Sequence, residues 1–123
     1  NHSHSDYSYH WHASGLFLHL AEHYEVMAEH NFLSENYSKS ADYSRLATEK
    51  AEKAASFNDA IAYARKRVTA LERLTRTEDV EKQLIDARTV LGLDNARMVH
   101  FAEAREAIVP IAYSGAIRPP IPS

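Results

Sequence analysis

Small and apolar residues recur at helical spacing along most of the chain, and between residues 36 and 74 they do so on more than one face. One line passes through Tyr37, Ala41, Ser44, Thr48, Ala51 and Ala55, and a second through Tyr43, Leu46, Ala47, Ala54 and Phe57. A helix on a protein surface needs one such line, whereas a helix that is packed from two sides needs two. The pattern therefore predicts helices that stack on one another, with a middle helix covered on both sides.

The periodicity and the helix-start signals divide the chain into about five predicted helices. They are expected over residues 13–31, 36–55, 58–74, 77–97 and 101–113. Asn36 and Thr77 are suitable N-caps, and acidic residues follow Thr77 where the helix dipole favours them. Ser56 stands three residues before Asp59, a spacing similar to a capping box, which predicts a helix break near residues 55–58.

Two residues are expected to disturb the later helices. Gly92 costs about 1 kcal/mol relative to Ala in the middle of a helix, which indicates that another helix crosses closely there. Pro110 should kink or end the fifth helix.

The two ends of the chain lack helical periodicity. Residues 1–12, NHSHSDYSYHWH, predict an irregular His-rich arm, and the proline-rich residues 114–123 predict an extended tail. Residues 13–113 remain as the helical domain, and 123 residues suffice for one domain. The predicted fold class is all-α: a short right-handed solenoid of antiparallel helical hairpins.

Composition narrows the possible partners. The chain has 14 Lys and Arg against 17 Asp and Glu, a formal charge of −3, which does not favour nucleic acid or an anionic membrane surface. Its longest apolar stretch, near residues 16–20, is far shorter than the roughly 20 residues that span a bilayer. The absence of cysteine removes disulfides and thiolate chemistry and fits a reducing compartment, so we expect a cytoplasmic protein.

Three segments share an aromatic residue that is followed three residues later by a small one. The pairs are Tyr37 with Ser40, Phe57 with Ala60, and Phe101 with Ala104. A small residue also lies nine positions before each aromatic: Ala28, Thr48 and Gly92. This arrangement resembles the tetratricopeptide repeat (TPR), whose two helices pack closely through small residues.

A narrower resemblance covers roughly residues 20–112. It is carried by His23, Tyr24, Ala41, Tyr43, Ala47, Ala51, Ala60, Ile61, Leu71, Leu74, Leu91 and Gly92. The run is similar to the helical repeat region that follows the ATPase module in large bacterial signalling proteins, including some linked to class III nucleotide cyclase domains. Those proteins obtain catalysis from other domains, and no GxxxxGK[ST] phosphate-binding motif occurs here. The resemblance implies a non-catalytic scaffolding or protein-interaction module, a fragment or relative of such a repeat region.

The resemblance also implies a protein-binding groove, because the first helix of each pair lines the concave surface in repeats of this type. The residues so placed are Glu22, Glu25 and Glu29 in the first helix and Asp86, Thr89 and Arg97 in the fourth. Three carboxylates within two turns favour a basic peptide or protein partner. The alternative interpretation is an ordinary solvated face.

The competing functional prediction is a zinc-dependent hydrolase. His19, Glu22 and His23 spell H-x-x-E-H, in which two histidines one turn apart bind zinc and the glutamate acts as base. A third ligand would have to come from elsewhere, and short motifs arise by chance in His-rich sequences. Adventitious metal binding is expected instead from the arm, through His2, His4, His10 and His12. We therefore expect no catalytic residues, no cofactor and no enzymatic activity.

The fifth predicted helix exposes many apolar side chains. They are Val99, Phe101, Ile108, Val109, Ile111 and Tyr113, and no further helix follows to cover them. Burial of apolar surface stabilises association by roughly 25 cal/mol per Å². The sequence therefore predicts a homodimer, formed through the C-terminal helices or by exchange of one hairpin.

Overall fold

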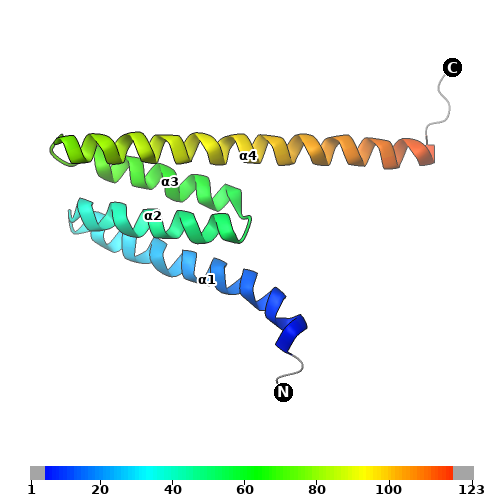
Figure 1. Ribbon diagram of the computed structural model, residues 1–123, viewed down its shortest axis with the longest axis horizontal. Coiled ribbons are helices and arrows are strands. Elements are labelled where there is room, and N and C mark those ends of the chain that lie inside the picture. Colours follow the sequence, from blue (N-terminus) through cyan, green and yellow to red (C-terminus); the bar gives the residue numbers. More distant parts are fainter. Residues whose placement is uncertain (1–4, 118–123) are drawn as a thin grey trace.

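The computed structural model describes the backbone of residues 5–117 and the side-chain surroundings of residues 15–104. Over this range the chain forms four helices and no β-strand. The helices are α1 (Ser5–Leu33), α2 (Tyr37–Lys53), α3 (Phe57–Glu72) and α4 (Glu78–Ile117). Each helix packs on its neighbour in sequence, α1 on α2, α2 on α3 and α3 on α4 (Figure 1). The prediction of an all-α fold is confirmed.

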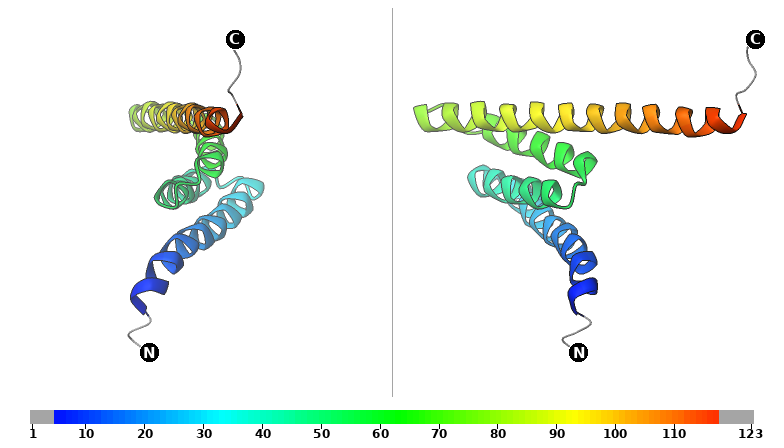
Figure 2. Two further views of the ribbon diagram at one scale, coloured as in Figure 1. Left: turned by 90° about the vertical axis from the view of Figure 1, so that its right-hand side faces the viewer. Right: turned by 45° about the vertical axis from the view of Figure 1, so that its right-hand side comes forward.

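The four helices lie in the order of the sequence, with α2 and α3 inside and α1 and α4 outside, as two further views show (Figure 2). The first part of α1 and the last part of α4 extend past the turn between α2 and α3 and diverge from each other (Figure 1). No helix in the described part of the chain combines the length and apolar character that crossing a membrane would require.

The predicted count of five helices is wrong, because α4 runs without a break from Glu78 to Ile117. The predicted interruptions near residues 98–100 and at Pro110 do not occur. Residues 97–101 contain neither glycine, proline nor a strong N-cap residue, so nothing local ends the helix there. A single proline removes one backbone hydrogen bond and more often bends a helix than terminates it.

Both ends of the helical region also differ from the prediction. Helix α1 begins at Ser5, so residues 5–12 are helical where an irregular arm was predicted, and α4 extends into the predicted tail as far as Ile117. Residues 5–12 have no apolar stripe with which to pack on another helix, but a segment can be helical without one when it continues an existing helix. Residues 1–4 and 118–123 lie outside the described residues.

Two three-residue turns of the same design join the first three helices. Glu35 and Ala55 have positive φ values of 63° and 57°. After Ala55, the amide of Ser56 donates to the carbonyl of Ala51 at 2.9 Å, as in a Schellman motif. The predicted break near residues 55–58 is therefore confirmed at residues 54–56.

Helices α2, α3 and α4 start where the sequence signals placed them, although the Asn36 side chain makes no cap hydrogen bond at the start of α2. At the start of α4, the amide of Val80 donates to Thr77 Oγ1 at 3.2 Å, which confirms Thr77 as the N-cap. At the start of α3, the Ser56 hydroxyl donates to Asp59 Oδ2 at 2.7 Å. The predicted pairing of these two residues is therefore present, although no side-chain cap bond to the backbone forms there.

Buried positions recur every 20 residues along α2, α3 and α4. Three such sets are Ser40, Ala60 and Val80; Ser44, Ala64 and Leu84; and Ala47, Arg67 and Ala87. One helix and its turn therefore occupy 20 residues, so a pair occupies about 40, against 34 in the TPR. With this 20-residue spacing, the position equivalent to Tyr37 and Phe57 is Thr77. The sequence pattern had suggested Phe101 as the third equivalent position.

Small side chains line the helix interfaces and allow close approach. The Ser40 hydroxyl of α2 donates to the backbone carbonyl of Ala28 in α1 at 2.8 Å, so the two helices are nearly in backbone contact. The larger apolar side chains, Leu71 and Leu84, gather where α3 packs on α4. Most of the core therefore consists of alanine and serine.

Replacing Ala55 by Gly should stabilise the protein. A side chain in the left-handed region costs about 1–2 kcal/mol, and glycine removes that cost while adding unfolded-state entropy. We expect a net gain of about 0.5–1 kcal/mol, measured by urea unfolding. Ala54→Gly is the control, because Ala54 has a φ of −87° and should lose stability. A loss of stability in both variants would contradict the strain argument.

Candidate functional site

The three predicted groove carboxylates of α1 do not form a free acidic patch. Lys66 of α3 donates to Glu25 Oε2 at 2.7 Å and also to Glu29 Oε1. Burial alone would lower the pKa of Lys66, but its hydrogen bonds to the two carboxylates outweigh burial and raise that pKa. Glu22 is exposed on the same helix. A cation of the chain itself therefore neutralises part of the predicted charge.

The three predicted groove residues of α4 are also engaged within the chain. Asp86 Oδ2 accepts from the buried Arg67 at 3.1 Å, and Thr89 Oγ1 donates to the carbonyl of Ile85 at 2.8 Å. Arg97 donates to Asp94, as described below. Among the described residues, no hydrogen bond or ion pair joins this set to the α1 carboxylates. The two halves of the predicted groove are thus not brought together by such contacts.

The candidate zinc motif lies on the solvent side of α1. His19, Glu22 and His23 are all exposed, and the His23 ring lies 5.7 Å from the ring of Tyr24. Across the described part of the chain, no group of three or more His, Cys, Asp or Glu side chains is placed to hold a metal ion. The four arm histidines, at positions 2, 4, 10 and 12, lie outside the residues whose side chains are described.

An acidic residue is fully buried where α4 crosses the end of α2. Asp94 is 0 % exposed, and its Oδ1 accepts from Arg97 Nη1 at 3.1 Å. The same Arg97 nitrogen lies 3.5 Å from Glu52 Oε2 on α2. Asp94 Oδ2 is also buried, and no described residue donates a hydrogen bond to it. The neighbouring Glu52 could donate one to the Asp94 carboxylate if Glu52 were protonated. Two carboxyl groups thus share one arginine.

The pKa of Glu52 is raised from 4.5 to about 7. The largest cause is loss of solvent around the carboxyl group, followed by a hydrogen bond to Asp94 and repulsion from its charge, while Arg97 acts in the opposite direction. A protonated Glu52 can donate to the Asp94 carboxylate, whereas an ionised Glu52 can only repel it. Asp94 continues the helical spacing of Val80, Leu84, Ala87 and Leu91, so an acid on an apolar face was the sequence signal for this cluster.

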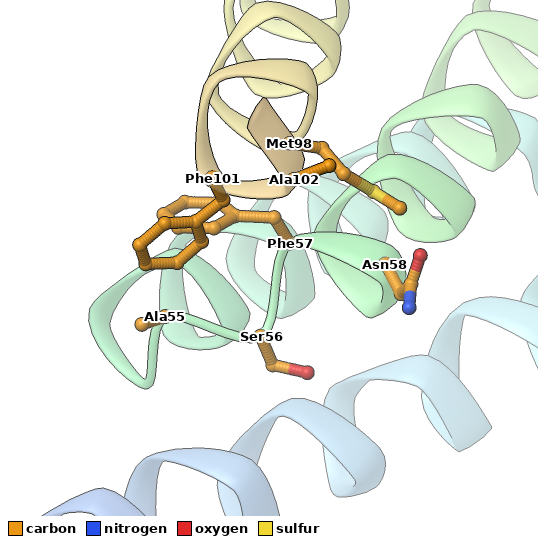
Figure 3. A pocket seen from close by; sticks show the side chains of 7 residues that line it. All are labelled: Ala55, Ser56, Phe57, Asn58, Met98, Phe101 and Ala102. Carbon is orange, nitrogen blue, oxygen red and sulfur yellow. The ribbon is translucent and has the colours of Figure 1, made fainter. Parts of the chain in front are cut away.

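Beside this cluster, the turn between α2 and α3 forms one wall of an apolar hollow with a volume of about 520 Å³, which we call the turn hollow (Figure 3). Its lining consists of Ala55, Ser56, Phe57, Asn58, Met98, Phe101 and Ala102. The rings of Phe57 and Phe101 meet edge to face with their centroids 5.8 Å apart, and Phe101 remains 53 % exposed. The Arg97 guanidinium lies 5.9 Å from the centre of the Phe57 ring. The sequence pattern marked both phenylalanines but not the hollow that they line.

Comparisons with protein-family models, with curated proteins and with solved structures found no match to this chain.

Glu52→Gln should reduce the dependence of stability on pH. Because the folded pKa lies above the unfolded one, the folded state binds more protons between pH 4.5 and about 7, so stability falls as pH rises through this range. Glutamine carries no charge and can donate to Asp94 at any pH. At about pH 8 we expect the free energy of unfolding of the variant to exceed that of the wild type by about 1 kcal/mol, a value reduced because Glu52 is partly in contact with solvent. At about pH 5 the two free energies should be nearly equal.

The matched control is Glu72→Gln on α3, where the carboxylate forms an exposed ion pair with Arg88 and does not contribute to the pKa shift of Glu52. Denaturant unfolding at the two pH values should give the wild-type pH dependence for this variant. An unchanged pH dependence in Glu52→Gln would show that Glu52 and Asp94 do not share a proton in solution.

Proposed function

We propose that the chain is a non-catalytic protein-interaction module whose stacked helices present the turn hollow to a peptide segment of a partner protein. The observation that carries this proposal is the composition of the hollow. Phe57, Met98 and Phe101 provide an open apolar surface, and Figure 3 shows their side chains beside the few polar groups of the lining. Partly exposed aromatic side chains in a concave site are typical anchor points for an apolar side chain of a partner.

The chemistry of the lining supports binding more than catalysis. Its polar side chains are Ser56 and Asn58, and the Ser56 hydroxyl donates to the Asp59 carboxylate. Among the described residues that line the hollow there is no histidine, lysine, cysteine or carboxylic acid, so they offer no group that could activate the serine as a nucleophile. The neighbouring Arg97 is already bound by Asp94 and lies 3.5 Å from Glu52, so the hollow offers a partner an apolar contact and not a free charge.

A basic partner, as inferred from Glu22, Glu25 and Glu29, has weaker support. Lys66 already binds two of these carboxylates, so a basic peptide would have to compete with an internal cation. We retain this face as a second protein-binding surface only for contacts centred on Glu22.

For the architecture, we propose a short right-handed solenoid of helical hairpins similar to TPR proteins. Packing of each helix on its neighbour in sequence and the 20-residue recurrence of buried positions support it. The relation to the repeat region of bacterial signalling ATPases is carried by the sequence resemblance. A location in the cytoplasm is likewise proposed, from the lack of cysteine.

Selection of binding peptides from a displayed random library, with the full chain as bait, tests the proposed function. We expect enriched peptides to share an apolar anchor, and Phe101→Ser to weaken their binding at least about tenfold, because the anchor loses its aromatic contact. Leu33→Ser is the control, since Leu33 is also an exposed apolar residue but lies at the end of α1. Peptides that bind Phe101→Ser as tightly as the wild type would contradict a role for the turn hollow.

The alternative, a zinc-dependent hydrolase, makes a different prediction. Such an enzyme would retain zinc in proportion to protein and lose it on His23→Ala. Metal analysis of the full chain and of this variant should instead give the same zinc content, set by the arm histidines. One zinc per chain that disappears in His23→Ala would overturn the non-catalytic proposal.

A further inference from the structure

Helix α4 has a second apolar face, opposite the one that packs on α3. Its buried side carries Val80, Leu84, Ala87 and Asp94. On the other side all residues of one stripe are exposed, and we call this stripe the outer face of α4: Ile85, Thr89, Gly92, Leu93, Ala96 and Val99. Ala96 stands nine residues after Ala87, which is half a turn of the helix away.

The outer face has the pattern of a helix-pairing seam. Positions 85, 89, 92, 96 and 99 alternate in steps of four and three, as in coiled coils. Ile85, Leu93 and Val99 are 65 %, 51 % and 56 % exposed, although each could be buried against a second helix. The stripe therefore has the composition of an interface and the exposure of a free surface.

Gly92 has no explanation within the chain. The sequence predicted a helix crossing at this position, but a methyl group added there would meet nothing within 4 Å among the described residues. A glycine in the middle of a helix lowers the stability of the helix, and no contact within the described residues compensates for this cost at Gly92. Approach of a helix from outside the chain would supply such a contact.

We propose that the outer face of α4 pairs with the same face of a second copy, with the two helices antiparallel. In such a pair, residues that are equally far from the midpoint between Gly92 and Leu93 face each other. Leu93 of each copy then meets the gap left by Gly92 of the other. The two exposed ends of the seam also match, because Lys82 faces Glu103 twice, once on each side of the two-fold axis.

A parallel pair lacks both features. It would place Gly92 against Gly92, leaving a gap, and Lys82 against Lys82, where like charges repel. The self-complementary charge and shape thus favour the antiparallel dimer over the parallel one.

The size of the face sets the expected affinity. From Lys82 to Glu103 the helix is about 33 Å long, and a contact strip about 12 Å wide buries roughly 400 Å² on each copy. This is about half of a standard stable interface, so the dimer should be weak, with a dissociation constant on the order of 10 µM. This inference does not depend on the turn hollow, because Phe101 lies outside the outer face.

Sedimentation of the full chain over about two decades of concentration around 10 µM tests the proposal. We expect a monomer–dimer equilibrium that Leu93→Glu abolishes. Gly92→Leu should weaken the dimer at least about tenfold by filling the gap, although it raises the helical propensity of the monomer. Val26→Glu on α1 is the control, because Val26 is exposed to a similar extent and should leave the equilibrium unchanged.

The antiparallel register has its own test. Lys82→Glu should weaken the dimer by opposing Glu103, and the double variant Lys82→Glu with Glu103→Lys should restore it, since the charges are then exchanged. A monomer over the whole concentration range, or a dimer insensitive to both Leu93→Glu and Gly92→Leu, would overturn the proposal. A dimer that responds to these two variants but is not restored by the charge exchange would overturn the antiparallel register.

Discussion

Close approach of neighbouring helices through small side chains is the constraint on which the rest of the structure depends. Ala28 and Ser40 are completely buried where α1 meets α2, and Ala47, Ala51 and Ala60 are completely buried further along the stack. The distance between two helix axes is set by the side chains between them, so these positions hold the helices close together. A larger side chain at any of them would have to separate two helices rather than fill a space.

The same constraint explains why polar groups matter in this fold. Alanine and serine bury little apolar area each, so the larger apolar contacts are few and gather near Leu71 and Leu84. Ion pairs also join helices that are not neighbours in sequence: Lys66 joins α3 to α1, and Arg97 joins α4 to α2. Burial of Asp94 lowers the stability of such a core, because one of its carboxylate oxygens has no hydrogen-bond donor unless Glu52 is protonated.

The arrangement also limits where function can lie. The inner helices α2 and α3 use two faces each for packing, which leaves the outer sides of α1 and α4 and the ends of the stack. The turn hollow lies at such an end, and the outer face of α4 lies on such a side. Both surfaces are apolar, and α4, the longest of the four described helices, contributes to the turn hollow and forms the whole of its own outer face (Figure 1).

The sequence by itself determined the all-α class, the two-sided packing of the middle of the chain, the break at residues 54–56 and the start of α4 at Thr77. These features depend on propensity, periodicity and capping, which act within a few residues of each other. The sequence pattern did not reveal the continuity of α4, because residues 97–101 contain no local signal that ends a helix and a single proline at position 110 is not enough to end one. Only the tertiary structure decided which polar side chains meet. Lys66 reaches Glu25 from 41 positions away, and Arg97 turns inward to Asp94 and Glu52 rather than lining a groove with the α1 carboxylates. The physical reason is that a helix with small residues on two faces can be rotated about its axis and still be packed, and only the contacts of the assembled stack select one rotation.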